Sequence, residues 1–559
     1  MSDKLTDFKQ ADSSLPTANR LWPLYGAGFE SLGRDGHMID VIMPEPGPDE
    51  LLVRHDAVGI CFSDIKVIKA GQNHPRIRKT MSEDPVVLGH EVALTVVKAG
   101  ANLQKEYHPG DRFIIQADIF YKGIGTAYGY ELRGGFQQYN IIDERVLKGD
   151  GGNYLLPVKQ STGYAEAALN EPWACVEASY TVSYRTAWKE GGKLYIGGNG
   201  AEVRLGNAAT WKPGSIVIDV ADAGAAAYLS DWAKRHSVAI VQDDGRKYDD
   251  IVILGNDAGL IERMFARLAY GGHFAVISQE PVTRSVQLDI GRLHYDRLGL
   301  SGAASNEISA AYEPFRTQLQ PQGVMWALGA AGPMGQMHVQ RAIEMPGGPR
   351  KIVATNLNRP RMAVLEEKLT PAAQKHGVEL VCLSRDQFES DAALLERLKQ
   401  ETDGKGFDDV VVIAASATAA EEGEVVMAEG CTVNVFAGLP RGTMAGFDLN
   451  LVVAKGVRYT GISGSSIDDL RHMLNLTESK QLETNRSVVA IAGLEGVPDG
   501  LQAVAKGTFP GKVVIYPMIS MPLTTIEALK EKLPSVYAKL ESDGSWTNAA
   551  EEELLRVML

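Results

Sequence analysis

The chain has 559 residues, enough for about three or four domains with hydrophobic cores of their own. Its 56 basic and 70 acidic residues give a formal net charge of −14, which argues against nonspecific binding of nucleic acid or of a membrane surface. We expect a globular protein that acts on small molecules.

The only cysteines, Cys61, Cys175, Cys382 and Cys431, lie far apart. They form neither a CxxC pair nor a dense framework, so we expect no disulfide scaffold and no all-cysteine zinc lobe. The N-terminal stretch is polar, and no segment approaches the apolar run of about 18 residues that a membrane helix needs. The sequence therefore predicts a cytoplasmic protein.

The first part of the chain is predicted to be rich in β-structure. Residues 38–61 alternate between apolar and polar types around a proline-rich turn at 44–48, which favours a strand on each side. Cys61, His90 with Glu91, and Glu171 then supply a thiolate, an imidazole and carboxylates, the ligand types of a catalytic zinc. Taken singly, each also has an ordinary interpretation, because an isolated cysteine is usually a small buried hydrophobe and an isolated glutamate a surface charge.

Five motifs follow one another in this region: Cys61-Phe62-Ser63-Asp64, Val87-Leu88-Gly89-His90-Glu91, Pro109-Gly110-Asp111-Arg112, Gly134-Gly135-Phe136 and Glu171-Pro172. In order and separation they resemble the medium-chain zinc alcohol and polyol dehydrogenases. The resemblance implies that Cys61, His90 and Glu171 bind catalytic zinc, and that Glu91 is a fourth or exchangeable ligand. It also implies that Ser63 passes the substrate proton outward and that Asp64 holds the far ring nitrogen of His90.

The chain departs from this family in two places. The cysteine-rich lobe that holds a structural zinc in many relatives is absent, so we expect one catalytic zinc and no structural zinc. Lys66 stands where relatives often have a proton-relay histidine. Residues 66–79 are basic and contain no acidic residue, so Lys66, Arg76 and Arg78 are candidates to bind a substrate phosphate or carboxylate, or belong to a solvated loop.

The middle of the chain contains a repeat. Tyr248-Asp249-Asp250 matches Phe407-Asp408-Asp409 at an offset of 159 residues (408 − 249 = 159). The same offset aligns Glu262 with Glu421, Gly271 with Gly430, Pro281 with Pro440, Asp289 with Asp448 and Gly302 with Gly461. Each copy alternates strand and helix candidates and ends in a strand, at 298–302 and 457–461, which predicts a doubly wound parallel sheet.

The second copy opens with a glycine-rich turn, Gly329-Ala330-Ala331-Gly332-Pro333-Met334-Gly335, between an apolar run and helix-compatible sequence. Such a turn binds the pyrophosphate of a dinucleotide, although glycine-rich turns also occur in ordinary loops. In the first copy, Gly197 and Gly200 are followed by Val203 where the second has Gly335. We therefore predict cofactor binding by Gly329, Gly332, Pro333, Met334 and Gly335.

The choice between NAD and NADP depends on the end of the next strand. An acidic residue there accepts the ribose 2′-hydroxyl of NAD, whereas a neutral residue with a nearby arginine suits the 2′-phosphate of NADP. The chain has Asn356 at this place, followed by Arg359 and Arg361. This favours NADP, although an arginine near Arg361 is also common in NAD enzymes.

The predicted fold is α/β with a β-rich part: a GroES-like zinc catalytic domain and two tandem Rossmann-like modules. The predicted divisions are the catalytic domain (1–188), a degenerate Rossmann-like module (189–305), a linker (306–322), the NAD(P)-binding Rossmann domain (323–475), a return to the catalytic domain (476–517) and a C-terminal helical extension (518–559). The extension resembles that of the sorbose-1-phosphate reductase branch. Dimers of the family pair their last strands, so the resemblance implies an intrachain pseudo-dimer of the two modules, as a monomer or homodimer.

Sequence and resemblance together predict a zinc-dependent oxidoreductase that transfers a hydride between NAD(P) and a secondary alcohol or ketone of a polyol, sugar or sugar phosphate. Two other functions remain open. The same residues would suit oxidation of an amino alcohol such as threonine. A nucleotide-binding sensor or scaffold without turnover would use the duplicated module as an interaction surface.

Overall fold

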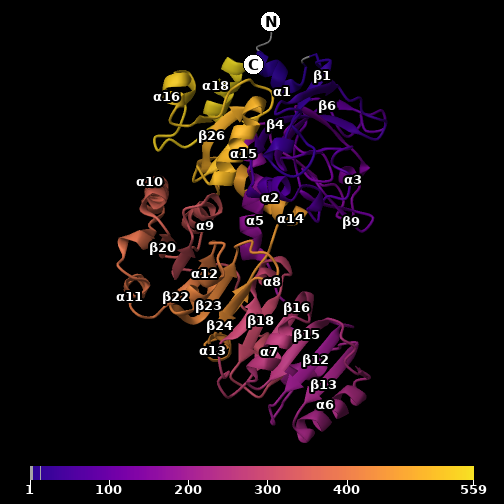
Figure 1. Cartoon of the computed structure of the whole chain (residues 1–559), viewed down its shortest axis with the longest axis vertical. Helices are drawn as coiled ribbons and strands as arrows, with labels where there is room; N and C mark the ends of the chain where they lie inside the picture. The colour runs from indigo at the N-terminus through magenta and orange to yellow at the C-terminus, as the bar shows by residue number, and fades with distance from the viewer. Residues whose placement is uncertain (1–3, 13) are drawn as a thin grey trace. The chain divides into compact units, whose positions relative to one another are not determined.

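The computed structural model describes residues 4–12 and 14–559 (Figure 1). The chain divides into two compact units, Met1–Glu177 with Gly464–Leu559, and Ala178–Ser463. Among the described residues, no helix is both long and apolar enough to cross a membrane.

The first unit is built on a mixed sheet in the order β11-β7-β6-β4-β27-β26-β28, with β10 paired to β4. Its strands are β4 (Leu51–Gly59), β6 (Glu91–Ala99), β7 (Arg112–Ile115), β10 (Tyr139–Ile142), β11 (Leu155–Pro157), β26 (Val488–Gly493), β27 (Lys512–Tyr516) and β28 (Thr524–Thr525). Every residue of β4 is buried, so both faces of this strand are covered. Strands from both ends of the sequence therefore share one core.

Short elements complete this unit. The other strands are β1 (Ala18–Leu21), β2 (Pro23–Leu24), β3 (Ile39–Ile42), β5 (Val86–Val87), β8 (Asp118–Tyr121) and β9 (Ile124–Ala127). The helices are α1 (Lys4–Gln10), α2 (Phe62–Ala70), α3 (Glu144–Leu147), α4 (Tyr164–Ala168), α5 (Asn170–Thr181), whose last residues belong to the second unit, α14 (Ile467–Glu478), α15 (Val497–Lys506), α16 (Leu529–Lys532), α17 (Pro534–Tyr537) and α18 (Asn548–Met558). The turns η1 (Phe29–Ser31), η2 (Gly71–Asn73), η6 (Thr484–Ser487) and η7 (Leu494–Gly496) join them.

The C-terminal helix α18 is joined to α4 and β27 of the same unit through one buried carboxylate. Glu551 accepts hydrogen bonds from the backbone nitrogens of Tyr164 and Ala165, at 2.5 and 2.7 Å, and from the hydroxyl of Tyr516 at 2.9 Å. The first two bonds satisfy backbone donors at the start of α4, where a helix has no internal acceptors. The extension is thus a packing element of this unit.

The second unit contains one long sheet in the order β14-β13-β12-β15-β16-β18-β25-β23-β22-β19-β20-β21. Its first half consists of β12 (Lys193–Gly198), β13 (Ser215–Val220), β14 (Ala239–Ile240), β15 (Tyr248–Leu254), β16 (Leu268–Ile277) and β18 (Gly299–Ala303). Its second half consists of β19 (Val324–Leu328), β20 (Lys351–Asn356), β21 (Glu379–Ser384), β22 (Phe407–Val412), β23 (Met427–Val435) and β25 (Arg458–Thr460). Strands within each half pair in parallel, which confirms the predicted tandem doubly wound modules.

Helices connect these strands. The first module has α6 (Ala223–Arg235), α7 (Ala258–Phe265), α8 (Ile290–Tyr295) and the turns η3 (Gly206–Thr210) and η4 (Ile308–Tyr312). The second has α9 (Pro333–Glu344), α10 (Arg359–His376), η5 (Arg385–Gln387), α11 (Asp391–Gln400), α12 (Ala417–Glu424) and α13 (Leu449–Ala454).

The two modules meet edge to edge. Strands β18 and β25 pair antiparallel at Leu300 and Tyr459, and β17 (Val286–Asp289) pairs antiparallel with β24 (Met444–Phe447). Gln287 lies opposite Gly446 in this second pairing. Both pairs are separated by the repeat offset (459 − 300 = 159 and 446 − 287 = 159), so each residue faces its own equivalent in the other copy.

The repeat extends to ion pairs made by two buried aspartates. In the first module Asp250 accepts from the guanidinium of Arg185 and from the backbone nitrogen of Lys189. In the second, Asp409 accepts from Arg316 and from the backbone nitrogen of Gln320 in the same way. The two aspartates are 159 residues apart and their arginine partners 131 (316 − 185 = 131), so the contact recurs although the chain between its two members differs in length.

Candidate active site

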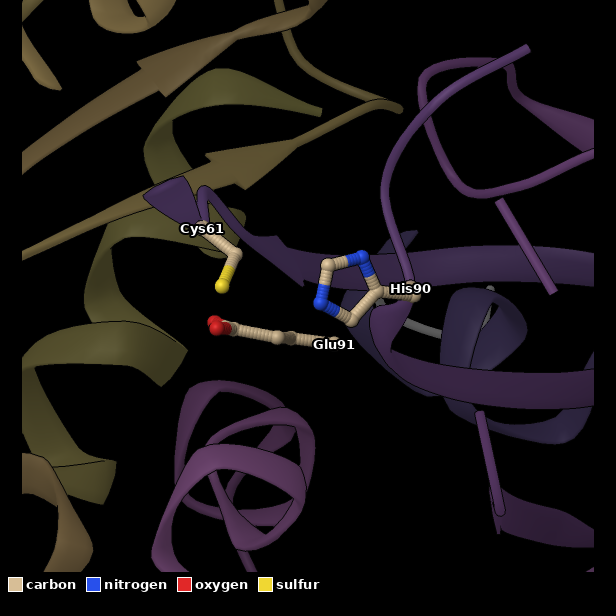
Figure 2. Close-up of side chains that lie close together, drawn as sticks. All are labelled: Cys61, His90 and Glu91. Atoms are coloured by element: carbon tan, nitrogen blue, oxygen red, sulfur yellow. The ribbon is translucent and has the colours of Figure 1, made fainter. Parts of the chain in front are cut away.

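Three side chains with metal-binding atoms converge in the first unit. The sulfur of Cys61, a ring nitrogen of His90 and a carboxylate oxygen of Glu91 all lie within 4.8 Å of one another. Figure 2 shows the three side chains pointing toward a common centre. Thiolate, imidazole and carboxylate are the ligands of catalytic zinc sites.

The strand register explains this convergence. Gly59, the last residue of β4, lies opposite Glu91, the first residue of β6, so the two chain segments that carry the ligands start from neighbouring positions. A Cβ atom on residue 59 would lie 2.0 Å from Oε2 of Glu91, so only glycine leaves room for this carboxylate. Cys61 then caps the N-terminus of α2, where helix amides favour negative charge.

Asp64 contacts the segments that carry two of the predicted ligands, Cys61 and His90. Its carboxylate accepts from the backbone nitrogens of Cys61, at 2.9 Å, and Gly89, at 3.2 Å, and lies 3.4 Å from Nδ1 of His90. Burial lowers the pKa of His90, but Asp64 and Cys61 raise it, and the net pKa is well above its ordinary value. The surroundings therefore favour positive charge at the imidazole, as a metal ion there would supply.

Ser63 lies against the ligand atoms. Its Oγ donates to the sulfur of Cys61 at 2.9 Å and lies 3.3 Å from Nε2 of His90. A hydroxyl can both donate and accept a proton, so this position suits proton transfer at the centre.

Glu91 is held by a lysine that sequence reasoning missed. Lys512 on β27 donates to Oε1 of Glu91 at 2.6 Å and to the carbonyl oxygen of Ile60 at 2.9 Å. Burial alone would lower the pKa of Lys512, but the charges of Glu91 and Cys61 raise it above its ordinary value. The other oxygen of Glu91, Oε2, is buried without a hydrogen-bond partner among the described residues, so it is available to a metal ion.

Glu171 lies close to this group but not within it. It stands in the first turn of α5, and burial raises its pKa to about 7, with Glu91 and Asp118 adding to the shift and His90 opposing it. The group of atoms within 4.8 Å comprises Cys61, His90 and Glu91 only among the residues that the structure describes. The structure thus brings three of the four predicted ligands together and leaves the fourth beside them.

Tyr130 lies between the predicted metal ligand His90 and the basic segment, and no sequence motif indicated it. Its ring centroid lies 5.8 Å from that of His90 and 5.5 Å from that of His74. The guanidinium of Arg76 lies over the same ring, 5.4 Å from its centroid. Burial raises the pKa of Tyr130 to about 12, so its hydroxyl stays protonated at neutral pH.

The predicted substrate residues differ in their surroundings. Arg76 forms an ion pair with Asp118 and carries a coulombic interaction with Glu171. Arg78 donates from its guanidinium to the carbonyl oxygen of Gly125 at 2.5 Å, and its backbone nitrogen donates to Glu131. Burial lowers the pKa of His74, and the positive charges of Arg76 and Lys66 lower it further, so these cations lie near one another.

The predicted dinucleotide turn has the expected strand, turn and helix. β19 ends at Leu328, Gly329 has a φ of 90°, and α9 begins at Pro333 with Gly332 as its N-cap and Met334 in its first turn. A Cβ atom on residue 335 would lie 2.4 Å from the carbonyl oxygen of Ala330, so Gly335 permits close packing of helix against turn. A Cβ atom on residue 332 would meet no atom within 4 Å, so this face of the turn is open to a ligand.

The end of β20 carries the predicted ribose residues. Asn356 is the last residue of the strand, and Asn358 caps α10 by accepting from the backbone nitrogen of Arg361 at 3.3 Å. Both predicted residues therefore lie at the carboxyl edge of the sheet, where dinucleotides bind in this fold class.

The corresponding turn in the first module is closed. The backbone nitrogen of Gly200 donates to the carbonyl oxygen of Leu254 on the neighbouring strand, at 3.0 Å. The short turn η3 (Gly206–Thr210) stands where the second module has α9. Without a helix N-terminus directed at the turn, the first module lacks the amides that would bind a pyrophosphate.

The chain matches known proteins in sequence and in fold. Residues 47–148 match the alcohol dehydrogenase GroES-like domain. The chain is 24% identical to mannitol-1-phosphate 5-dehydrogenase of Aliivibrio fischeri, covering 92% of this chain and 93% of the relative. It is 21% identical to L-sorbose 1-phosphate reductase of Klebsiella pneumoniae, covering 93% and 95%.

A solved structure shares the fold. Alcohol dehydrogenase from Thermotoga maritima superimposes with a TM-score of 0.51 at 14% identity, covering 90% of this chain and all of the other. The sequence matches, the GroES-like domain and this common architecture agree with the predicted resemblance. The chain therefore contains an alcohol dehydrogenase GroES-like domain and is similar over most of its length to sugar-phosphate dehydrogenases and reductases.

Proposed function

We propose that the chain is a zinc-dependent oxidoreductase that transfers a hydride between NAD(P) and a secondary alcohol or ketone of a polyol, sugar or sugar phosphate. The convergence of Cys61, His90 and Glu91 is the observation that carries this proposal. The buried and unpartnered Oε2 of Glu91, together with surroundings that favour positive charge at His90, fits a single zinc ion. Glu171 would approach the same ion when ligands exchange.

The two units contribute different parts of the reaction. Bound zinc would polarise the alcohol oxygen as a Lewis acid, and bound nicotinamide would take or give the hydride. Ser63 Oγ, which donates to the sulfur of Cys61, would take the proton of the substrate hydroxyl and pass it outward, and the Asp64 carboxylate, 3.4 Å from Nδ1 of His90, would orient that ring. Gly329–Gly335 of the second unit would hold the pyrophosphate on the amides of α9.

Metal analysis and a nicotinamide absorbance assay test this function. We expect about one zinc per chain after purification and hydride transfer with at least one member of a panel of polyols, ketoses and their phosphates. If the purified chain holds no zinc and transfers hydride with no substrate of the panel, yet binds the dinucleotide, it is instead a nucleotide-binding sensor without turnover.

A phosphorylated substrate is favoured by the charges beside the metal ligands. Lys66 and Arg76 place positive charge near His74 and lower its pKa, and Arg76 pairs with Asp118. Arginine forms strong, charge-assisted hydrogen bonds with phosphate. The full-length relatives named above act on mannitol 1-phosphate and sorbose 1-phosphate, which agrees with this proposal.

Replacing Arg76 with glutamine should raise KM for a phosphorylated substrate about 10- to 100-fold while changing kcat little, because a charge-assisted contact of the ground state is lost. Steady-state kinetics with a polyol phosphate and its unphosphorylated counterpart measures the difference. The exposed Arg556, which pairs with Glu553, provides the control Arg556→Gln. An equal rise in KM with both substrates would show that Arg76 supports the fold of the site and does not recognise phosphate.

Lys512 is expected to compensate the charge of Glu91. Replacing Lys512 with methionine should lower the free energy of unfolding of the zinc-free chain by about 3–5 kcal/mol, because a buried carboxylate loses its cation. Zinc should restore part of this loss by supplying positive charge to the same carboxylate. Urea unfolding with and without zinc measures both effects.

An exposed pair provides the control for Lys512. Lys98 forms an ion pair with Glu45 at the surface, so Lys98→Met should change the free energy of unfolding by less than about 1 kcal/mol, with no effect of zinc on the difference. A loss of the same size in both variants would contradict the proposed compensation.

The first module is proposed to take the place of a second subunit. The self-equivalent pairs Leu300 with Tyr459 and Gln287 with Gly446 are what a two-fold axis between two copies produces. Pairing of β18 with β25 also covers strand edges that would otherwise invite association with another chain. The closed turn at Gly200 agrees with a module retained for this contact and not for cofactor binding.

A further inference from the structure

A carboxylate from a neighbouring strand lies at the end of β20. Asn356 of β20 and Ser384 of β21 are paired in the sheet, and Asp386 follows two residues later in η5. Oδ2 of Asp386 accepts a hydrogen bond from the backbone nitrogen of Arg359, at 3.0 Å, in the first turn of α10. Asp386 thus supplies a carboxylate close to the end of β20, whose own last residue is the neutral Asn356.

The nearby arginines already have carboxylate partners. The guanidinium of Arg359 forms an ion pair with Glu366 at 2.6 Å, and Arg385 forms one with Asp391. Arg385 also donates to the carbonyl oxygen of Phe388. Of the two arginines that favoured NADP on sequence grounds, Arg359 therefore has its charge balanced by a carboxylate of its own helix.

We propose that the chain prefers NAD(H) over NADP(H) and that Asp386 is the residue that sets this preference. The inference rests on the proposed dinucleotide site at Gly329–Gly335. A ribose 2′-hydroxyl can donate to a carboxylate, whereas a 2′-phosphate adds about two negative charges beside it and competes for the same backbone nitrogen of Arg359. Asp386 is a specificity residue that acts on the ribose and takes no part in hydride transfer.

Fluorescence titration of the zinc-loaded full chain with NADH and with NADPH tests the proposal. We expect NADH to bind at least about tenfold more tightly than NADPH. In Asp386→Asn the ratio of the two dissociation constants should shrink about tenfold, mainly because NADPH binds more tightly. Asparagine keeps an oxygen that can accept from Arg359, so the turn should stay folded. Glu396→Gln removes one exposed charge from α11 and should leave the ratio unchanged.

The outcomes separate this inference from the proposed function. Equal or tighter binding of NADPH by the unaltered chain, or an unchanged ratio in Asp386→Asn, overturns the role of Asp386 while leaving the dinucleotide site in place. Binding of neither nucleotide removes the proposed function, and this inference with it. A circular dichroism spectrum of each variant excludes unfolding as the cause of a changed ratio.

Discussion

Replacing Cys61 with alanine should abolish zinc binding and turnover together. Its sulfur is one of three atoms that converge within 4.8 Å, so its removal leaves an imidazole and a carboxylate that cannot hold the ion tightly. We expect kcat/KM to fall about a thousandfold or more, the equivalent of the several kcal/mol that a Lewis acid contributes to the transition state. Metal analysis and the nicotinamide assay, run on the same preparation, measure the two losses.

The second unit provides the control for this substitution. Cys382 lies partly buried on β21 of the second unit and is not one of the proposed ligands, so Cys382→Ala should retain both zinc and turnover. NADH binding should survive in Cys61→Ala, because the dinucleotide turn belongs to the other unit. Full activity in zinc-free Cys61→Ala would remove the metal from the mechanism.

The second module could be predicted because its signals are local in sequence. The apolar run before Gly329, the glycines and the helix-compatible residues after them are all neighbours in sequence, and the structure has β19, a turn and α9 at these places. The constant offset of 159 residues likewise predicted two modules, because duplicated sequence folds into duplicated elements. Val203 in place of a third glycine indicated that the first copy was degenerate, and its α-helix is replaced there by a short turn.

Contacts between residues far apart in sequence could not be predicted in the same way. Lys512 binds Glu91 across 421 positions of sequence, and no local sequence pattern around a single lysine indicates which carboxylate it will contact. Tyr130 and Asp386 reach their neighbours through sheet order and loop packing, which follow from the whole fold. The grouping of Cys61 with His90 and Glu91 came from the family resemblance, since their spacing alone leaves the ordinary interpretations open.

Gly332 gives the sharpest test of the dinucleotide turn, because substitution there should have opposite effects on folding and binding. It is the N-cap of α9, its φ of −81° suits any residue, and an added Cβ would meet no atom within 4 Å. Aspartate is a favoured N-cap, so Gly332→Asp should keep or slightly raise the free energy of unfolding. The added carboxylate should repel the pyrophosphate and weaken NADH binding about a hundredfold or more.

Thermal unfolding and NADH titration of the same variant measure the two effects. Gly200→Ala in the closed turn of the first module is the control, although its Cβ would lie 3.1 Å from that of Leu254. It should leave NADH affinity unchanged, because that turn is bonded to β15 and has no helix behind it. If Gly332→Asp binds NADH as the unaltered chain does, the turn at 329–335 is not the pyrophosphate site. Loss of binding in Gly200→Ala would move the site to the first module. If only Gly332→Asp loses NADH binding, and its melting temperature is unchanged, cofactor binding belongs to the second module.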